Sequence, residues 1–445
     1  MTKIKNADLP TLGLYLDIHP ILESNERSRY RYFTILSSYV KKFAPKSRYA
    51  LALLETYREV FGIKEESQND SKIYNFSGIF RFRFIMLLDI WHFTSFDNPD
   101  KAEREMDEVI TMYGLKSHYQ GKFQSLYDVI FKDDNSMKFL QLTNIIDRWK
   151  NNKNFLENRT LKIGFTATTS AGKSTLINAI VGKQVNRSRN LSCTAKIHYI
   201  ANKPFEDGFV SENDFLLTLN ADYQTLMDDN NQNQSGRIDV TSYFRSDAIN
   251  EHRVMFIDTP GVNSSLDMEH QLITREELQN EKLNLLVYVI NSNYIGVEDD
   301  RIHLKWILDT LKRRNIIFAI NKLDSFTSED SISDAINNVR EHIKDNGYDG
   351  EPIICPVSAR AGLLAKRKIF DNNLDENDLD ELADDVRRFK HEKYNLIRYY
   401  PAEIIKQCMY IIDGEKDNSI NKNLELILNC GLMPLEQIIM KYATE

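Results

Sequence analysis

Between residues 160 and 360, short apolar runs alternate along the chain with segments of helical spacing. The runs are seven or eight residues long and rich in Val, Ile and Phe, which is typical of strands buried on both faces of a parallel sheet. Their alternation with helices predicts a doubly wound α/β fold with a mostly parallel sheet, whose ligands bind beyond the carboxyl ends of the strands. The runs are LKIGFTA (161–167), AKIHYIA (195–201), HRVMFID (252–258), NLLVYVIN (284–291), NIIFAIN (315–321) and PIICPVS (352–358).

The same pattern divides the chain into three parts. Residues 1–155 carry apolar residues at three- and four-residue steps, which predicts an N-terminal helical bundle. Residues 156–365 hold the α/β domain, and residues 366–445 are expected to form helices that close or extend it. The acidic run at 371–385 favours a solvated helix or linker over a metal site, because it lacks the Gly and terminal Glu of a calcium loop. The polar stretch 228–236 predicts a loop.

Composition limits the class of protein. The 445 residues are 42% hydrophobic, as in globular chains of two or three domains, and the formal net charge of −8 argues against a broad surface for nucleic acid. The N-terminus lacks the apolar region of a secretory signal, and no apolar run approaches the ~20 residues that span a bilayer. We therefore expect a cytoplasmic protein with at most peripheral membrane contact. No CxxC pair, and hence no zinc site or disulfide framework, is indicated by Cys193, Cys355, Cys408 and Cys430.

The first apolar run leads into ATTSAGKST, residues 167–175, which resembles a phosphate-binding loop. In such loops the backbone N–H groups and the next helix N-terminus cradle phosphate, while Lys173 reaches the β- and γ-phosphates and Ser174 ligates Mg²⁺. The strict pattern has glycine in place of Ala167. Alanine is small enough for close packing but adopts a positive φ only at a cost. The expected phosphate-binding residues are Thr169, Ala171, Gly172, Lys173, Ser174 and Thr175.

Three further polar motifs each follow a later run. DTPG offers Asp258 to Mg²⁺, usually through water, and the Gly261 N–H to the γ-phosphate. NKLD places Asp324 where a carboxylate can accept hydrogen bonds from guanine, and adenine lacks those donors. SAR lies where a loop would close over the base. Each motif alone is weak, but their order at the ends of apolar runs indicates a guanine-nucleotide site. Its base-side residues are Asn321, Lys322, Asp324, Ser358, Ala359 and Arg360.

These motifs resemble those of the dynamin superfamily, in particular its bacterial members. The resemblance is carried by SAGKST, by DTPGVNSS followed by HQLITREEL, by SARAGLLAKR and by CGLMPLEQIIMKY. It covers residues 158–365 and, more loosely, the last 16 residues. It identifies Thr194, in LSCTAKI, as the switch threonine that contacts Mg²⁺ and the attacking water. Thr194 and Asp258 are 64 residues apart, and Asp258 and Asn321 are 63 apart, which implies an enlarged GTPase domain.

The resemblance also implies hydrolysis of Mg²⁺-bound GTP to GDP and phosphate. Many small GTPases orient the attacking water with a glutamine directly after DTPG, where this chain has Val262. By resemblance, catalysis would instead rely on Ser170, Lys173 and Thr194, on a monovalent cation (K⁺ or Na⁺), and on the pairing of two GTPase domains. The expected partner is therefore a second copy of the chain. Thr169 departs from the glutamine found at that position in some dynamins, so no contact across the pair is assigned to it.

The N-terminal residues leave two questions open. FSGIFRFRFIMLLDIWHF, residues 76–93, has apolar residues on every face, which favours a buried helix over the membrane-interface helix that Arg81 and Arg83 would suit. The first interpretation of function is a GTPase stimulated by association and coupled to assembly or membrane action. The alternative is a slow or non-hydrolysing GTP-dependent module that recruits a protein partner through its helical domain. Nucleic acid is not an expected partner.

Overall fold

The computed structural model describes residues 6–64, 78–114, 117–134, 139–186, 196–227, 236–262, 268–311 and 315–445. The chain divides into two compact units. Unit 1 consists of Met1–Asn158 together with Pro204–Glu212 and Leu216–Asn220, and unit 2 consists of the remaining residues from Arg159 to Glu445. Each unit is described by itself.

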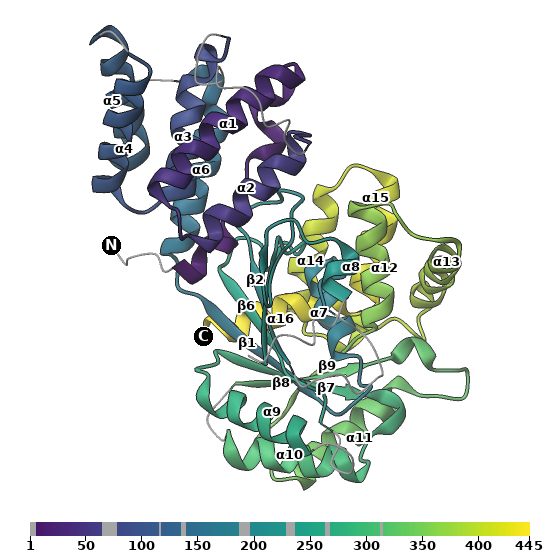
Figure 1. The fold of residues 1–445 in the computed structure, drawn as a ribbon. Coiled ribbons are helices and arrows are strands. Elements are labelled where there is room, and N and C mark those ends of the chain that lie inside the picture. Colours follow the sequence, from purple (N-terminus) through teal and green to yellow (C-terminus); the bar gives the residue numbers. More distant parts are fainter. Residues whose placement is uncertain are drawn as a thin grey trace. The chain divides into compact units, whose positions relative to one another are not determined.

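Unit 1 is built from α-helices (Figure 1). Local capping sets where they begin: the Asn25 side chain accepts a hydrogen bond from the Ser28 N–H at 2.9 Å before α1, and Pro99 occupies the first position of α4. The helices are α1 (Glu26–Phe43), α2 (Arg48–Val60), α3 (Arg83–Thr94), α4 (Pro99–Met112), α5 (Ser117–Phe131) and α6 (Thr143–Glu157). Short 3-10 helices are Asn6–Thr11, Leu16–Ile18, Pro20–Glu23, Phe80–Phe82 and Leu140–Leu142.

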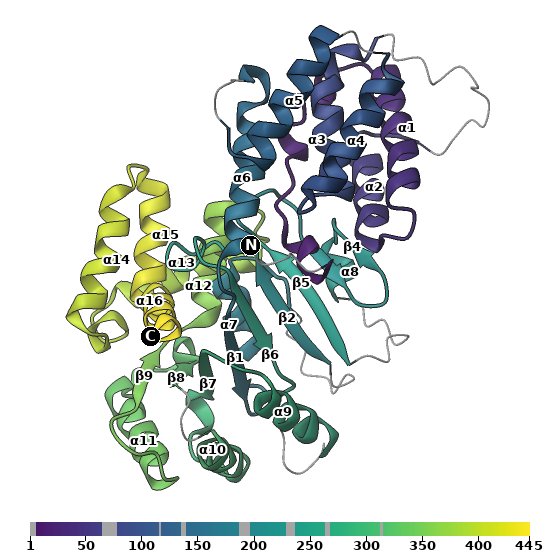
Figure 2. The same cartoon turned by 90° about the vertical axis from the view of Figure 1, so that its left-hand side faces the viewer.

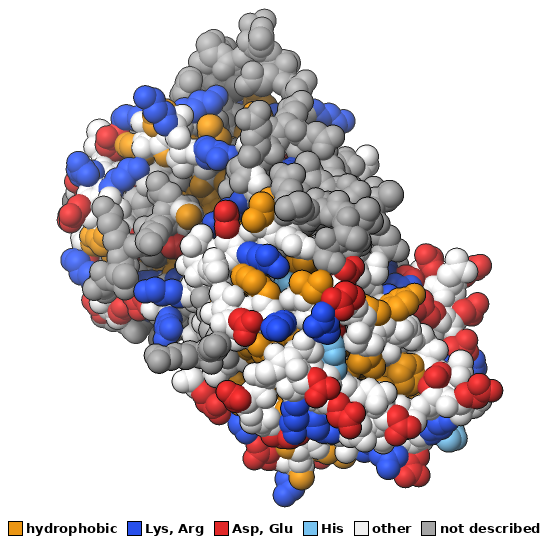
Figure 3. Space-filling view, turned by 90° about the horizontal axis from the view of Figure 1, so that it is seen from below, with side chains coloured by type: hydrophobic (Ala, Val, Ile, Leu, Met, Phe, Trp, Pro, Cys, Tyr) orange, Lys and Arg blue, Asp and Glu red, His pale blue; other side chains and the backbone are white. Residues whose placement is uncertain are grey.

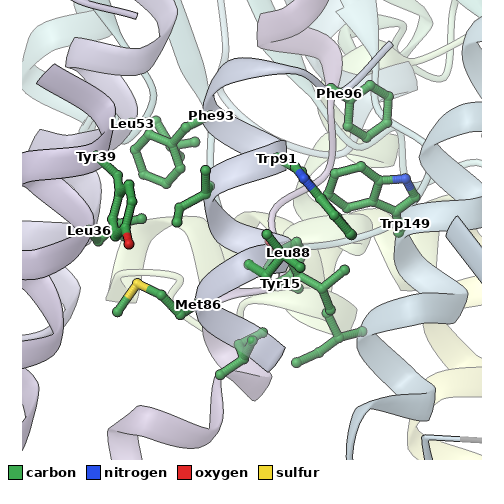
Figure 4. Packing of buried hydrophobic residues seen from close by; sticks show 14 of the residues in the cluster. Tyr15, Leu36, Tyr39, Leu53, Met86, Leu88, Trp91, Phe93, Phe96 and Trp149 are labelled. Carbon is green, nitrogen blue, oxygen red and sulfur yellow. The ribbon is translucent and has the colours of Figure 1, made fainter. Parts of the chain in front are cut away.

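Helix α3 is the centre of this unit. Every residue from Ile85 to Phe93 is buried, so the sequence-based expectation of a core helix is confirmed and the membrane-interface alternative is not. Large side chains of α1, α2 and α6 pack around it, as Figure 4 shows for Tyr39, Leu53 and Trp149. Trp91 and Trp149 are therefore packing residues.

One carboxylate lies inside this apolar core. Asp89 of α3 is fully buried and accepts hydrogen bonds from the hydroxyls of Tyr15 and Tyr57 at 3.0 Å and of Tyr32 at 2.5 Å, while His19 Nε2 lies 3.0 Å from it. Burial first, and then the charge of Asp89, raises the pKa of all three tyrosines well above its ordinary value. The three phenols therefore stay protonated and donate hydrogen bonds to Asp89. Together with the contact from His19, these hydrogen bonds link α1, α2 and the N-terminal segment to α3.

Removing this acceptor is expected to destabilise unit 1. Asp89→Ala leaves four buried polar groups without their partner, and each buried donor left unpaired costs about 1–3 kcal/mol. We expect the free energy of unfolding to fall by at least ~3 kcal/mol. Urea denaturation followed by tryptophan fluorescence measures this, since two of the three tryptophans lie in unit 1. Asp107→Ala, an exposed position on α4, is the control, and equal midpoints for both variants would contradict the assignment.

The described strands form one mixed sheet of nine in the order β4-β3-β5-β2-β6-β1-β7-β8-β9. The mostly parallel α/β sheet is thus confirmed. The run AKIHYIA is an exception to the expected parallel pairing, because β2 is parallel to β5 but antiparallel to β6, with His198 opposite Asp258. The strands are β1 (Leu161–Ala167), β2 (Ile197–Asn202), β3 (Ser211–Asn213), β4 (Leu217–Thr218), β5 (Arg237–Ser242), β6 (Val254–Asp258), β7 (Leu285–Asn291), β8 (Ile316–Asn321) and β9 (Ile353–Pro356).

Helices cover both faces of this sheet (Figures 1 and 2). One face carries α7 (Lys173–Val181), α12 (Ala359–Phe370) and α16 (Leu432–Thr444). On α16, Leu435, Ile438 and Ile439 are buried. The other face carries α9 (Met268–Asn280), α10 (Glu298–Thr310) and α11 (Ile332–Asp345). The further helices are α8 (Tyr223–Met227), α13 (Glu376–Lys390), α14 (Ala402–Gly414) and α15 (Asn418–Asn429).

Parallel pairing brings the carboxyl ends of β6, β1, β7 and β8 to one edge of the sheet. Asp258, Ala167, Asn291 and Asn321 end these strands, so the polar segments that follow them start from a common edge. No helix in the described part of the chain is both long and apolar enough to cross a bilayer. On the surface seen in Figure 3, described side chains of both charges are interspersed with hydrophobic ones.

Candidate functional site

The loop between β1 and α7 has the backbone of a phosphate cradle. Ala167 pairs with Val289 as the last residue of β1, and its φ is not in the left-handed region, so the cost expected for alanine at this position does not arise. Ser170 and Gly172 instead take positive φ values, 64° and 82°. Alternation of this kind turns successive N–H groups toward one side.

Gly172 is required by close contact as well as by its φ. A Cβ atom there would lie 2.4 Å from Asn321 Nδ2. Gly172 is also the N-cap of α7, which makes no side-chain capping hydrogen bond, so the helix N-terminus remains open to an anion. Thr175 follows Ser174 in the first turn of this helix.

Asp258 gathers the polar groups of the loop. Lys173 Nζ forms an ion pair with Asp258 Oδ1, and Ser174 Oγ donates to Asp258 Oδ2 at 3.2 Å. Lys173 and Asp258 are only 8% and 6% exposed, so the pair is largely removed from water. The Asn186 amide also donates to Asp258 Oδ2. The structure thus brings together the lysine, hydroxyl and carboxylate that the first two motifs predict.

The chain after Asp258 lies against the phosphate loop. The Val262 N–H donates to the Ala167 carbonyl at 3.1 Å, and the Thr169 N–H to the Val262 carbonyl at 3.4 Å. A Cβ atom on Gly261 would lie 3.3 Å from the Thr169 Cα atom, so glycine allows this approach. Val262 itself is buried. Thr194, like Cys193, lies outside the described residues.

Asn321 joins the phosphate loop to the segments that follow β8 and β9. Its Nδ2 donates to the Ala171 carbonyl at 3.1 Å, and its Oδ1 accepts from the Ala359 N–H at 3.0 Å. Ser358 Oγ donates to Asp324 Oδ1 at 2.7 Å, which fixes the rotation of that carboxylate. The Lys322 side chain lies beside Gly172. The base-side motifs therefore meet the phosphate loop.

Arg360 has partners on α13, the acidic run. Its guanidinium binds the Glu381 carboxylate at 2.7–3.0 Å and Asp378 at 2.6 Å. Residues 376–385 of the run lie in α13, so the expected helix is confirmed for that part. Asp378 and Glu381 of this helix bind Arg360 in the segment after β9. A role of Arg360 toward nucleotide stays a prediction.

Sequence reasoning missed two amides near the loop. Asn291 Nδ2 donates to the Ser170 carbonyl at 3.2 Å. Since Asn291 ends the run NLLVYVIN, the rule applied to the other runs would have found it. Asn186 lies in no recognisable motif, and no pattern in the sequence marks it.

The donor set fits Mg²⁺. Ser174 Oγ and the Asp258 carboxylate supply hard oxygen atoms at the open helix N-terminus, where Oγ lies 3.2 Å from Oδ2. Mg²⁺ is usually held by one or two such groups together with substrate phosphates and water. Within the described ranges, no three His, Cys, Asp or Glu side chains gather into a metal cage.

The sequence was compared with known proteins. Residues 163–341 match the dynamin family. The matched segment contains the phosphate loop, DTPG and NKLD, and it is similar to the dynamin superfamily. A probable transmembrane FZO-like GTPase of Arabidopsis thaliana chloroplasts is 25% identical over 51% of this chain. Dynamin-like protein A of Bacillus subtilis is 24% identical over 43%. The chain spans only 22% and 16% of the lengths of these two relatives.

Solved structures also resemble this chain. One is described as an oligomerised bacterial dynamin pair that provides a mechanism for the long-range sensing and tethering of membranes. It is 15% identical, the match covers 91% of this chain and 65% of that one, and the TM-score is 0.37. At that score no comparison of individual elements follows.

Asp385 of α13 adds a titratable group close to the charges of Asp324 and Glu381. Burial first, and then the charges of Asp324 and Glu381, raises the pKa of Asp385 from 3.8 to about 7, against the opposing effects of Arg388 and Arg360. Its Oδ2 atom is buried without a hydrogen-bond partner. The folded protein therefore holds this proton to a higher pH than the unfolded chain does.

This shift has a definite sign. Between about pH 4 and pH 7 the folded state binds the proton and the unfolded state does not, so the free energy of unfolding falls as pH rises through that range. The full effect corresponds to roughly 4 kcal/mol. Asp385→Asn cannot ionise and should be more stable than the wild type at pH 8 but close to it near pH 4. Urea denaturation at several pH values measures this. Asp384→Asn, at an exposed neighbour, is the control, and a stability difference that did not change with pH would contradict the shift.

Proposed function

We propose that this chain binds Mg²⁺-bound GTP and hydrolyses it to GDP and phosphate, and that association of two GTPase domains stimulates hydrolysis. The observation that carries the proposal is the convergence of Lys173, Ser174 and Asp258 on one side of the phosphate loop with Asn321 and Asp324 on the other. The match of residues 163–341 to the dynamin family supports it.

The residues have distinct roles in this proposal. Lys173 neutralises charge on the β- and γ-phosphates, and the α7 N-terminus with its open N–H groups binds phosphate oxygens. Ser174, Thr194 and, through water, Asp258 hold Mg²⁺, which would offset charge on the phosphates. Asp324 accepts from the guanine N1–H and amino group. Water then attacks the γ-phosphorus, the bond to the β–γ bridging oxygen breaks, and GDP, phosphate and a proton result.

Self-association is the second part of the proposal. The buried Val262 offers no hydrogen-bonding group to the water, so orientation must come from elsewhere. Ser170 has a left-handed φ in the loop, and its carbonyl accepts a hydrogen bond from Asn291. Ser170 can therefore help to place a monovalent cation near the negative charge that develops on the phosphates during hydrolysis. Tyr294, three residues beyond Asn291, is 63% exposed, and an exposed aromatic beside the site suits contact with a second domain. Peripheral membrane contact is proposed from the dynamin-family match of residues 163–341 alone.

Base selection tests the guanine assignment. Wild-type protein should bind GTP roughly 10⁴-fold more tightly than ATP, because ATP leaves the Asp324 carboxylate unpaired. Asp324→Asn should weaken GTP binding and reduce that ratio. Titration with fluorescent nucleotides measures both constants. Asp334→Asn, an exposed carboxylate on α11, should behave as wild type. Equal affinity of wild-type protein for ATP and GTP would reject the guanine site.

Turnover tests the associative mechanism. Specific activity should rise with protein concentration and should fall when K⁺ or Na⁺ is replaced by a large organic cation. Ser170→Ala and Thr194→Ala should each lower kcat by about 10²-fold, the scale of losing one group that stabilises transition-state charge. Thr310→Ala at the end of α10 is the unaffected control, and Lys173→Ala the inactive one. Slow turnover independent of concentration, with GTP binding retained, would instead favour the interaction module that recruits a partner through its helices.

A further inference from the structure

Among the described residues, three side chains donate to Asp258, and two of them belong to the phosphate loop. Lys173 Nζ and Ser174 Oγ are the groups expected to turn toward phosphate and metal. The third is the Asn186 amide, which donates to Asp258 Oδ2 and is 3% exposed. It is uncharged and lies in no motif, so the proposed function leaves its role open.

The backbone at Asn186 is fixed by a second buried amide. Asn178 Oδ1 accepts from the N–H groups of Val185 at 3.1 Å and Asn186 at 2.9 Å, and Asn178 Nδ2 donates to the Asn186 carbonyl at 2.8 Å. Asn178 lies four residues after Ser174 in α7, so the two side chains share one face of that helix. Helix α7 thereby positions both Ser174 and, through Asn178, Asn186.

These contacts lead to a role at the metal site. When Lys173 binds phosphate and Ser174 binds the metal, both release Asp258. Of these three donors, Asn186 then remains hydrogen-bonded to Asp258. Its hydrogen bond to Oδ2 sets the rotation of the carboxylate and leaves Oδ1 to accept from a metal-bound water. Groups that orient a metal-binding carboxylate in this way commonly change metal affinity by about 10–100-fold.

We propose that Asn186, held in place by Asn178, is a positioning residue that orients Asp258 for Mg²⁺ when nucleotide binds. The proposal rests on the proposed function, because it assumes that guanine nucleotide binds with Mg²⁺ at this loop. It assigns Asn186 an effect on metal-dependent affinity only, since its amide points to Asp258.

Binding measurements separate this effect from activity. The dissociation constant of fluorescent GDP is measured with Mg²⁺ and with EDTA, and the ratio gives the affinity gained from the metal. Asn186→Ala should lower that ratio at least about 10-fold while leaving the affinity in EDTA unchanged. Asn178→Ala should lower it in the same direction. The double variant should lose little more than Asn186→Ala alone, because the two residues act as one unit.

A matched control uses another buried asparagine of unit 2. Asn202 is 1% exposed, accepts from the Phe244 N–H at 2.8 Å and donates to the carbonyls of Asn250 and His252 at 3.1 Å, but it lies at the opposite end of β2 from Asp258. Asn202→Ala should reduce thermal stability without changing the Mg²⁺ ratio. Thermal unfolding of all variants confirms that they fold.

The remaining outcomes are distinguishable. An unchanged ratio in folded Asn186→Ala would overturn the positioning role. A higher ratio would also overturn it, by showing that Asn186 competes with the metal for Asp258. Wild-type protein that binds no guanine nucleotide would reject the proposed function itself, whereas wild-type binding that gains nothing from Mg²⁺ would reject only the metal role and this inference with it.

Discussion

The arrangement of the site depends on the hydrogen bonds made by the side-chain amide of Asn321. Its two ends bond to the Ala171 carbonyl of the phosphate loop and to the Ala359 N–H after β9. Gly172 must be glycine partly because this amide passes within 2.4 Å of where a Cβ would be. One buried amide thus sets the distance between the segment that would hold phosphate and the segment that would hold the base.

Much of unit 2 could be predicted from sequence because the relevant signals are local. Six apolar runs marked β1, β2, β6, β7, β8 and β9, and the motifs after four of them lie at one edge of the sheet, as the parallel fold requires. The polar, alternating β5 was missed because RIDVTS is not an apolar run. The antiparallel orientation of β2 was also missed, since orientation depends on which strand becomes its neighbour and not on its own residues.

The contacts within the site were harder to predict. Arg360 matches a nucleotide-proximal motif, yet the structure pairs it with Glu381 and Asp378 on α13, which sequence analysis treated as solvated. Asn186 and Asp385 carry no sequence signal, because burial and neighbouring charges from distant segments give them their properties. In unit 1, likewise, periodicity identified α3 as a core helix but did not reveal that Asp89 is satisfied by three tyrosines and a histidine from other segments.

The pairing of β2 with β6 links the proposed metal site to the packing of the sheet. His198 of β2 lies opposite Asp258 in the antiparallel register, and Asp258 also accepts a hydrogen bond from the Asn186 amide. A shift of β2 by one residue along β6 would turn the β2 side chains to the opposite face of the sheet. Because Asp258 is the last residue of β6, a substitution that disturbs this register would also displace its carboxylate, although β2 itself carries no predicted site residue.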